Sequence, residues 1–293
     1  MRTTTRLRQL ISAGSLVVPG AFNAITALIA RDVGYSAVYV SGATTNNGVA
    51  GLPDIGMLSM TEMVQTAGYV AAAVPDLPVI ADVDTGFGGL FNAARTIREY
   101  EKAGLAAVHM EDQIFPKRCG HLPGKSVVPV EEMCAKIRAA VDARQDPDFM
   151  IIARTDARAV NGLEDAIERS LAYVEAGADM VFPDALTSAE EFAAYARGIG
   201  GRAPCMANMT EFGQTPYMPS AEFFRMGYAM VIYPVTTFRV MMKAVRDALV
   251  ELKETDTQVG FLDKMLDRKE LYRLVGYKEF ENLDLRLSRG EKR

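Results

Sequence analysis

Histidine, cysteine and tryptophan are scarce in this sequence: its 293 residues include two His, three Cys and no Trp. The cysteines (Cys119, Cys134 and Cys205) are too few for a disulfide framework, and with two histidines they cannot build the repeated Cys/His ligand sets of structural zinc sites. Sparse, unpaired cysteines are typical of proteins from reducing compartments, so we expect a cytoplasmic protein.

An excess of basic residues is missing as well. The 32 Lys and Arg residues are outnumbered by 37 Asp and Glu residues, which gives a net charge of −5 and a pI near 5.3. This balance argues against a general attraction to nucleic acid or to an anionic membrane surface. With 49% hydrophobic and 24% charged residues the chain can bury a large core, which excludes general disorder. We therefore expect a small-molecule partner.

Long hydrophobic runs are also absent. No apolar run reaches 18 residues, so no membrane span is expected. The opening MRTTTRLRQLISAGSLVVPG lacks the uninterrupted apolar segment of a secretion signal, and we interpret it as a helix that leads into a strand. Its short Arg/Thr-rich stretch leaves a mitochondrial address open as an alternative.

Eight short apolar runs recur along the chain, each followed by a helical pattern. They are continuous rather than alternating, which is typical of parallel strands covered on both faces. The runs are Leu16–Pro19, Ala37–Ser41, Val79–Asp84, Ala106–Glu111, Phe149–Arg154, Met180–Pro183, Pro204–Asn208 and Met230–Pro234. Eight β/α units in a chain of this length predict a (β/α)8 barrel of the α/β class, with a doubly wound open sheet as the alternative.

Helices are expected between these runs, over residues 23–32, 61–73, 92–103, 131–143, 163–176 and 188–199. Gly34, Gly104 and Gly177 follow three of them and predict left-handed C-caps. No linker divides the chain, so we expect one barrel domain over residues 1–254. Residues 255–293 are expected to form a charged helical extension, which packs on the barrel rim or on a neighbouring subunit.

Polar residues collect where the expected strands end, which is where barrels of this kind hold their active sites. Asp82 and Asp84 lie two apart and therefore on one side of their strand, Glu111 ends the adjacent strand, and Asp54 completes an acidic group. Hard oxygen ligands without thiolate or imidazole favour Mg²⁺ or Mn²⁺ over zinc. Any single carboxylate could instead cap a helix or pair with an arginine, but the whole set predicts a metal site.

A second constellation is the loop KRCGH, from Lys117 to His121. Two cations and an imidazole around one thiol are expected to lower the pKa of Cys119, which would act as proton donor, proton acceptor or nucleophile. Glycines and flanking prolines suit a loop that moves as a lid. His109 is either a buried core histidine or a group that supports Glu111, and the sequence leaves both open.

Several common signatures are missing. The chain has no GxGxxG at a strand-to-helix turn, no Walker loop, no GxSxG elbow and no lysine at a strand end suited to a Schiff base. Cys134, in a helical run, and Cys205, in a buried strand, are interpreted as inert.

The segments SGATTNNGVAGLPDIG, ADVDTGFG, VHMEDQ, PKRCGH and MIIARTDA, in this order, resemble the isocitrate lyase/phosphoenolpyruvate mutase superfamily over nearly the whole chain. KRCGH is similar to the branch that breaks C–C bonds and unlike the phosphonate-forming mutases, which lack this Cys. The length and the stretches NMTEFGQTP and LYRLVGYKEFE are most similar to the 2-methylisocitrate lyase group.

This resemblance implies a Mg²⁺-dependent lyase, with Mn²⁺ as an alternative metal, that cleaves 2-methylisocitrate to pyruvate and succinate by retro-aldol (Claisen-type) chemistry in the methylcitrate cycle of propionate catabolism. It places the metal on Asp54, Asp82, Asp84 and Glu111. It places the substrate carboxylates on a polar set that also includes two glycines: Ser41, Gly42, Gly120, Arg154, Asp184, Asn208 and Thr210. It also implies a homotetramer in which the eighth helix is swapped between paired subunits.

Two catalytic groups are expected to transfer protons to and from the substrate. Tyr39 is the candidate base for the substrate hydroxyl. Cys119 is the general acid that protonates the carbanion left by cleavage, and its pKa is set by Lys117, Arg118 and His121.

Two departures from the group affect the substrate. Ala43-Thr44 stand where close relatives carry a longer glycine run, and Asp184 in FPDA stands where they carry Glu. A carboxylate shorter by one methylene changes its hydrogen-bond reach, so the pocket can suit another 2-hydroxy acid. The alternatives are cleavage of 2,3-dimethylmalate and hydrolysis of oxaloacetate. Two further alternatives are a phosphonate mutase, which the Cys loop disfavours, and an inactive scaffold barrel, which the acidic group disfavours.

Overall fold

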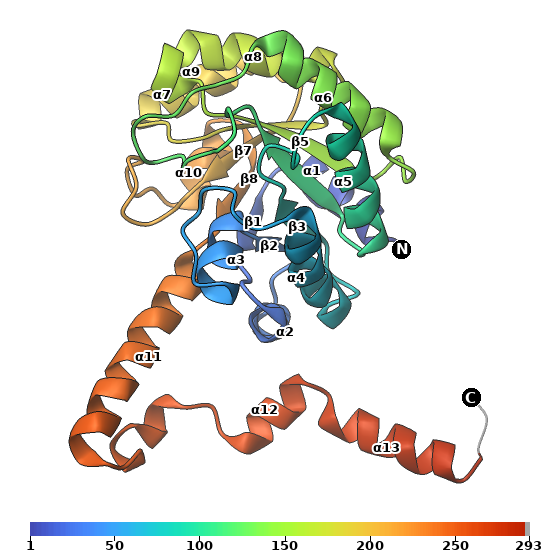
Figure 1. Ribbon diagram of the computed structural model, residues 1–293, viewed down its shortest axis with the longest axis vertical. Coiled ribbons are helices and arrows are strands. Elements are labelled where there is room, and N and C mark those ends of the chain that lie inside the picture. Colours follow the sequence, from blue (N-terminus) through green and yellow to red (C-terminus); the bar gives the residue numbers. More distant parts are fainter. Residues whose placement is uncertain (291–293) are drawn as a thin grey trace.

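The computed structural model describes residues 1–290 and contains a barrel of eight parallel strands (Figure 1). The strands are short and almost wholly buried: β1 (Leu16–Pro19), β2 (Val38–Val40), β3 (Val79–Asp82), β4 (Ala107–Glu111), β5 (Met150–Thr155), β6 (Met180–Pro183), β7 (Cys205–Asn208) and β8 (Tyr228–Tyr233). They follow one another in chain order around the barrel, with β8 paired to β1.

The barrel closes between β1 and β2 at a bridge from Gly20 to Tyr39, where the Ala21 N–H donates to the Tyr39 carbonyl at 2.7 Å. This closure confirms the (β/α)8 prediction over the open sheet. All eight expected runs are strands, with ends that differ from expectation by one or two residues.

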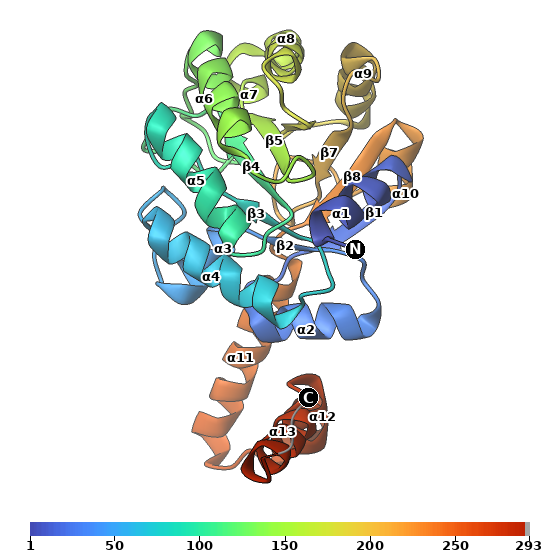
Figure 2. The same ribbon diagram turned by 90° about the vertical axis from the view of Figure 1, so that its right-hand side faces the viewer.

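Helices surround the strands (Figure 2). They are α1 (Thr3–Ser12), α2 (Ala24–Val33), α3 (Gly42–Val49), α4 (Met60–Ala73), α5 (Leu90–Lys102), α6 (Val130–Ala143), α7 (Arg158–Asn161), α8 (Leu163–Glu175), α9 (Ala189–Ile199), α10 (Ser220–Arg225) and α11 (Thr236–Thr255). Gly34, Gly104 and Gly177 have φ of 100°, 88° and 108°, which confirms the expected left-handed C-caps.

Packing follows the two sequence periods. Strand residues such as Ile80, Ile152 and Phe182 fill the barrel interior. On the outside, helices place apolar stripes against the strands; in α5 the buried stripe includes Ala93 and Ile97, four residues apart.

The C-terminal part leaves the barrel. In α11 only Phe238 is buried, and the helix projects away from the strands (Figures 1 and 2). It is followed by the 3₁₀ helix η1 (Val259–Lys264), α12 (Arg268–Leu274) and α13 (Tyr277–Ser288). Arg273 of α12 returns to the barrel, where its guanidinium donates to both carboxylate oxygens of Asp32 at 2.7 and 2.6 Å. Residues 291–293 of the expected extension lie outside the described residues.

Within residues 1–290, no helix is both long enough and apolar enough to cross a membrane.

Candidate active site

A cavity of about 360 Å³ lies at the C-terminal ends of the strands. Most of the residues expected from the sequence line it: Tyr39, Ser41, Asp54, Asp82, Lys117, Arg118, Cys119, Gly120, His121, Arg154, Asp184, Asn208 and Thr210. The remaining three, Gly42, Asp84 and Glu111, each contact a lining residue. The structure therefore brings the expected residues together at the expected end of the barrel.

Asp82 ends β3 and is fixed by the backbone around it. Its Oδ1 accepts a hydrogen bond from the Asp84 N–H at 2.9 Å, and its Oδ2 accepts one from the Gly42 N–H at 3.2 Å. Gly42 is the first residue of α3, so Asp82 faces the positive end of that helix. Asp84 has φ of 46°, in the left-handed region that Asp tolerates better than most residues.

Lys117 lies in the acidic group. Its buried ammonium is 2.8 Å from Asp84 Oδ1 and also pairs closely with Asp54. Burial raises the pKa of Asp84 to about 6, and the attraction of Lys117 opposes that rise. The lysine thus neutralises part of the negative charge that four adjacent carboxylates would otherwise carry.

Two carboxylate oxygens of the acidic group are available to a divalent cation. Within residues 1–290, Asp84 Oδ2 and Glu111 Oε1 are buried without a hydrogen-bond partner, as expected for oxygens that await a cation. Over the same residues, however, His, Cys, Asp and Glu side chains nowhere gather in a group of three placed to hold a metal. The donors fit a hard ion that takes one or two carboxylates and completes its shell with water or substrate, as Mg²⁺ does.

Arg154 lines a second wall of the cavity, next to the acidic group, whose Glu111 Oε2 lies 3.2 Å from its Nε. Its guanidinium donates to Asp184 Oδ2 at 2.7 Å and to Asp156 Oδ2 at 2.9 Å. Asp184 Oδ1 accepts a hydrogen bond from Asn208 Nδ2 at 3.0 Å, and His121 Nε2 lies 3.8 Å from the same oxygen. Asp184 thus contacts Arg154, Asn208 and His121, which are expected to bind a substrate carboxylate.

The Cys119 loop lies against this wall. A Cβ at Gly120 would overlap Asp184 Oδ2 and lie 2.5 Å from Arg154 Nη2, so only glycine permits this approach. The expected lowering of the thiol pKa is wrong: burial, followed by the charges of Asp184 and Asp54, raises the pKa of Cys119. The cations do not offset this effect because Lys117 pairs with Asp54 and Asp84, and Arg118 is exposed.

His121 is held by the loop between β7 and α10. The Gln214 N–H donates to His121 Nδ1 at 3.1 Å, and the Gln214 side chain donates to the His121 carbonyl at 3.2 Å. A bonded, unprotonated Nδ1 leaves the ring proton of neutral His121 on Nε2, which faces Asp184. A Cβ at Gly213 would lie 2.6 Å from Nδ1, so glycine is also needed here.

Tyr39 lies at the base of the cavity. Its hydroxyl is 2.5 Å from His109 Nε2, and both side chains are buried. Burial raises the pKa of Tyr39 well above its ordinary value and lowers the pKa of His109 to about 4. His109 is therefore a neutral imidazole behind the cavity wall, in contact with the predicted base.

Several cavity residues were not identified as site residues from the sequence: Asn47, Pro53, Phe182, Ile232, Pro234, Val235, Phe238, Arg239 and Met242. Most are apolar, and Phe238, Arg239 and Met242 belong to α11. Nothing in the sequence shows that the first turns of this helix pass the cavity before the helix leaves the barrel. Arg239 is the notable addition, because it brings another guanidinium to the cavity and lies 5.3 Å from the centre of the Phe212 ring.

Known proteins are similar to this chain in both sequence and fold. The family model described as phosphoenolpyruvate phosphomutase matches residues 7–253. The 2-methylisocitrate lyase of Aeropyrum pernix is 49% identical over 284 residues, which cover 97% of this chain and 90% of that protein.

Two solved structures extend the comparison. The crystal structure of 2,3-dimethylmalate lyase, described as a PEP mutase/isocitrate lyase superfamily member, superposes with a TM-score of 0.92 at 36% identity and covers 98% of this chain and 96% of that one. The complex of phosphonopyruvate hydrolase with oxalate and Mg²⁺ gives a TM-score of 0.89 at 29% identity, with coverage of 98% and 99%. With these matches over almost its whole length, the chain belongs to the PEP mutase/isocitrate lyase superfamily.

Proposed function

We propose that this protein is a lyase that cleaves 2-methylisocitrate to pyruvate and succinate, in the methylcitrate cycle of propionate catabolism and in the cytoplasm. The observation that carries the proposal is that Cys119, Gly120 and His121 line the same cavity as Asp82 and Lys117. The 49% identity to a 2-methylisocitrate lyase supports the choice of substrate.

A divalent cation, Mg²⁺ or alternatively Mn²⁺, is proposed at the acidic wall. Asp82 and Asp84 would hold it, with Asp54 and Glu111 reached directly or through water. When bound, the cation supplies Lewis-acid stabilisation of negative charge on the substrate hydroxyl and its neighbouring carboxylate. The Mg²⁺ complex of phosphonopyruvate hydrolase, a protein of the same fold, supports a divalent cation here.

The substrate is a tricarboxylate, and the cavity offers several places for its charged groups. Arg154 and Asn208 can bind one carboxylate, together with Thr210 and the Gly120–His121 segment. Ser41 and the N-terminal N–H groups of α3, which begin at Gly42, can bind another, because helix N-termini attract anions. Arg239, at the α11 side of the cavity, is proposed for the remaining carboxylate.

Two proton transfers complete the reaction. Tyr39, as phenolate, is proposed to accept the proton of the substrate hydroxyl and so become a neutral phenol, and the positive charge of a cation bound at the acidic wall would favour that phenolate. His109 Nε2, 2.5 Å from the phenol oxygen, positions the ring. The bond between the two product halves then breaks, and its electrons pass to the succinate half as a carbanion. The Cys119 thiol, kept protonated by burial, donates its proton to that carbanion. His121 and Arg154 hold the neighbouring negative charge.

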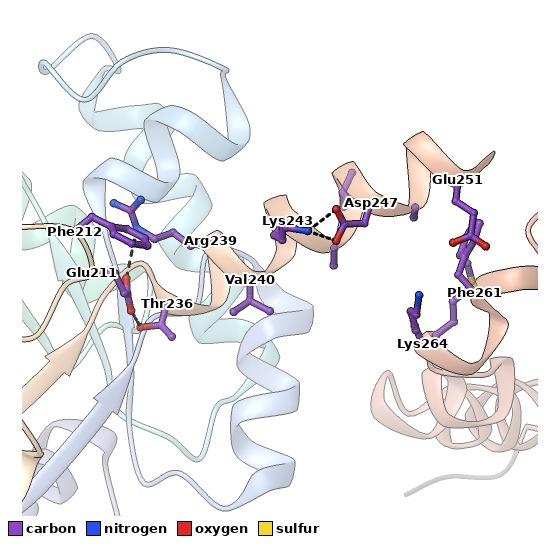
Figure 3. Close-up of a pocket in the computed structure, with 14 residues that line it drawn as sticks. Glu211, Phe212, Thr236, Arg239, Val240, Lys243, Asp247, Glu251, Phe261 and Lys264 are labelled. Atoms are coloured by element: carbon purple, nitrogen blue, oxygen red, sulfur yellow. Dashed lines mark hydrogen bonds and ion pairs between the residues drawn. The ribbon is translucent and has the colours of Figure 1, made fainter. Parts of the chain in front are cut away.

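We also propose a homotetramer built from helix-swapped dimers, with residues 1–254 as the barrel domain and residues 255–293 as the extension. On α11, large apolar side chains are exposed, among them Val240, Val245 and Leu249 at 66%, 48% and 60%. A groove of about 920 Å³ separates α11 from Phe261 of η1 (Figure 3). Exposed apolar surface on this scale needs a partner, and a second copy with the same projecting helix would cover it.

The experiment is a substrate panel with Mg²⁺ present: 2-methylisocitrate, isocitrate, 2,3-dimethylmalate, oxaloacetate and phosphonopyruvate. Pyruvate release is measured for 2-methylisocitrate and 2,3-dimethylmalate, glyoxylate release for isocitrate, acetate release for oxaloacetate, and loss of the substrate for phosphonopyruvate. The largest kcat/KM is expected for 2-methylisocitrate. Faster turnover of any other member of the panel would replace the proposed substrate by that compound.

Cleavage of 2,3-dimethylmalate is the second candidate. It is favoured by the TM-score of 0.92 to 2,3-dimethylmalate lyase and by Asp184 where the 2-methylisocitrate lyase group carries Glu. Both substrates yield pyruvate, so the other product decides: succinate from 2-methylisocitrate and propionate from 2,3-dimethylmalate.

A further inference from the structure

Lys125 is a buried lysine four residues after His121, in the loop between β4 and α6. It is not among the residues that line the cavity. Its side chain is only 2% exposed. The ammonium donates to Asp156 Oδ1 at 2.8 Å and, through a close contact, to the carbonyl oxygen of Gly120. The ammonium therefore joins two separate elements, the loop that carries Cys119 and the segment that follows β5.

Both partners of Lys125 lead to the cavity. Asp156 accepts hydrogen bonds from Arg154 Nε at 2.9 Å and Nη2 at 3.2 Å. Asp156 is itself anchored, because its N–H donates to Asp112 Oδ1 at 2.9 Å and both carboxylates are fully buried. On the other side, Gly120 lies between Cys119 and His121. The Lys125 ammonium therefore links the Cys119–His121 segment, through Asp156, to Arg154.

The geometry points to Lys125 as a positioning residue for Cys119 and His121. By holding the Gly120 carbonyl on Asp156, it keeps the 119–121 segment against Arg154 and Asp184, in the place where a proton donor can reach a bound substrate. Its catalytic consequence rests on the proposed function, but the placement of the thiol does not.

The test measures that placement by the rate at which iodoacetamide alkylates Cys119, followed peptide by peptide by mass spectrometry in the full chain without substrate. Lys125→Met removes the ammonium at nearly constant volume. Loss of a hydrogen bond from a charged group shifts an opening equilibrium by about tenfold or more, so we expect Cys119 alkylation to accelerate by that factor while buried Cys205 stays slow.

Arg144 provides a matched control at the opposite end of the barrel. Its Nη1 also joins a backbone carbonyl and a carboxylate, Phe149 O at 2.9 Å and Asp179 Oδ2 at 2.7 Å. Arg144→Met is expected to lower the Tm without accelerating alkylation of Cys119. Lys125→Arg keeps a positive charge beside Asp156, so it remains testable if the Met variant does not fold, and we expect it to show an intermediate alkylation rate.

An unchanged Cys119 alkylation rate in both Lys125 variants would overturn the proposal, and so would equal acceleration by Arg144→Met. The activity measurement is separate: if 2-methylisocitrate is the substrate, Lys125→Met lowers kcat by more than it raises KM, and Lys125→Arg restores part of kcat. Acceleration of alkylation without turnover of 2-methylisocitrate by the parent protein would retain Lys125 as a positioning residue and reject the proposed function.

Discussion

Cys119 and Lys117 are two residues apart in sequence, yet the structure gives them separate partners. Lys117 neutralises Asp54 and Asp84, while Cys119 is part-buried near Asp184. The sequence correctly identified both residues as members of one cavity, but closeness along the chain did not reveal which charge acts on which group. The thiol is therefore kept protonated, which suits a proton donor and not a nucleophile.

Replacing this proton donor should reduce turnover while substrate binding persists. We expect Cys119→Ser to lower kcat by about 10²–10⁴-fold, the usual contribution of one general acid, with KM close to the parent value. Cys134→Ser is the control, because Cys134 lies on α6 with its thiol toward the Ala172 carbonyl at 3.6 Å. Full turnover by Cys119→Ser would remove the thiol from the mechanism.

The pH dependence of kcat should also report this thiol. A general acid works only while protonated, so kcat falls as pH rises through its pKa. Because burial raises the pKa of Cys119, the alkaline fall is expected above the ordinary thiol pKa of about 8.5. The measurement is kcat against pH, together with the pH dependence of Cys119 alkylation. A fall near neutral pH would contradict the raised pKa.

Gly120 permits the close approach of the loop, and this can be tested with a single methyl group. Gly120→Ala places a Cβ against Asp184 and Arg154, so the loop must withdraw. Since a displacement of about 1 Å can cost about 10²-fold in rate, we expect kcat/KM to fall by at least that factor. In the control Gly89→Ala, the new Cβ has no neighbour within 4 Å and activity is expected to persist.

At the scale of elements, the strands were predictable from the sequence, but several helices, among them α3 and α11, were not. The eight apolar runs reveal the strands because buried parallel strands need continuous β-branched sequence. Helix α3 consists of poor helix formers; Thr44 and Thr45 donate to the Ser41 carbonyl at 3.1 and 2.9 Å, so tertiary burial overrides propensity there. The path of α11 away from the barrel depends on what covers it, which one chain's sequence does not state.

The exposed apolar side chains of α11 predict an assembly that a single added charge would disrupt. Leu249→Asp puts a charge into the apolar stripe, so we expect the tetramer to dissociate into smaller species in light scattering coupled to size exclusion. Glu254→Lys, an exposed position on another face of the same helix where one charge replaces another, is expected to leave the tetramer intact. If the parent chain is already a monomer, the helix-swapped assembly is wrong.

For the whole molecule, the acidic wall links metal binding to stability. Burial raises the pKa of Asp84 from 3.8 to about 6, so the folded metal-free chain binds this proton more tightly than the unfolded chain and loses stability as pH rises from about 4 to about 6. Mg²⁺ competes with the proton. At pH 7.5 and a saturation of about 100 times Kd, we expect Mg²⁺ to raise the Tm by about 5 °C.

This rise should shrink at pH 5, where Asp84 is protonated, and vanish in Asp84→Ala at every pH. The control is Asp142→Ala, an exposed carboxylate on α6. Thermal denaturation with and without Mg²⁺ gives the answer. An Mg²⁺-induced rise of equal size in Asp84→Ala would place the ion elsewhere in the molecule.

The closure of the barrel has a further consequence for motion. Most neighbouring strands share a ladder of several residue pairs, whereas β1 and β2 meet at the bridge between Gly20 and Tyr39, and β6 and β7 meet at the single pair Val181–Cys205. Thermal opening of the barrel is therefore expected at these two seams, and Tyr39 belongs to the first of them. Amide hydrogen exchange at Ala21, whose N–H bonds to the Tyr39 carbonyl, becomes a reporter of how often the base of the cavity loosens.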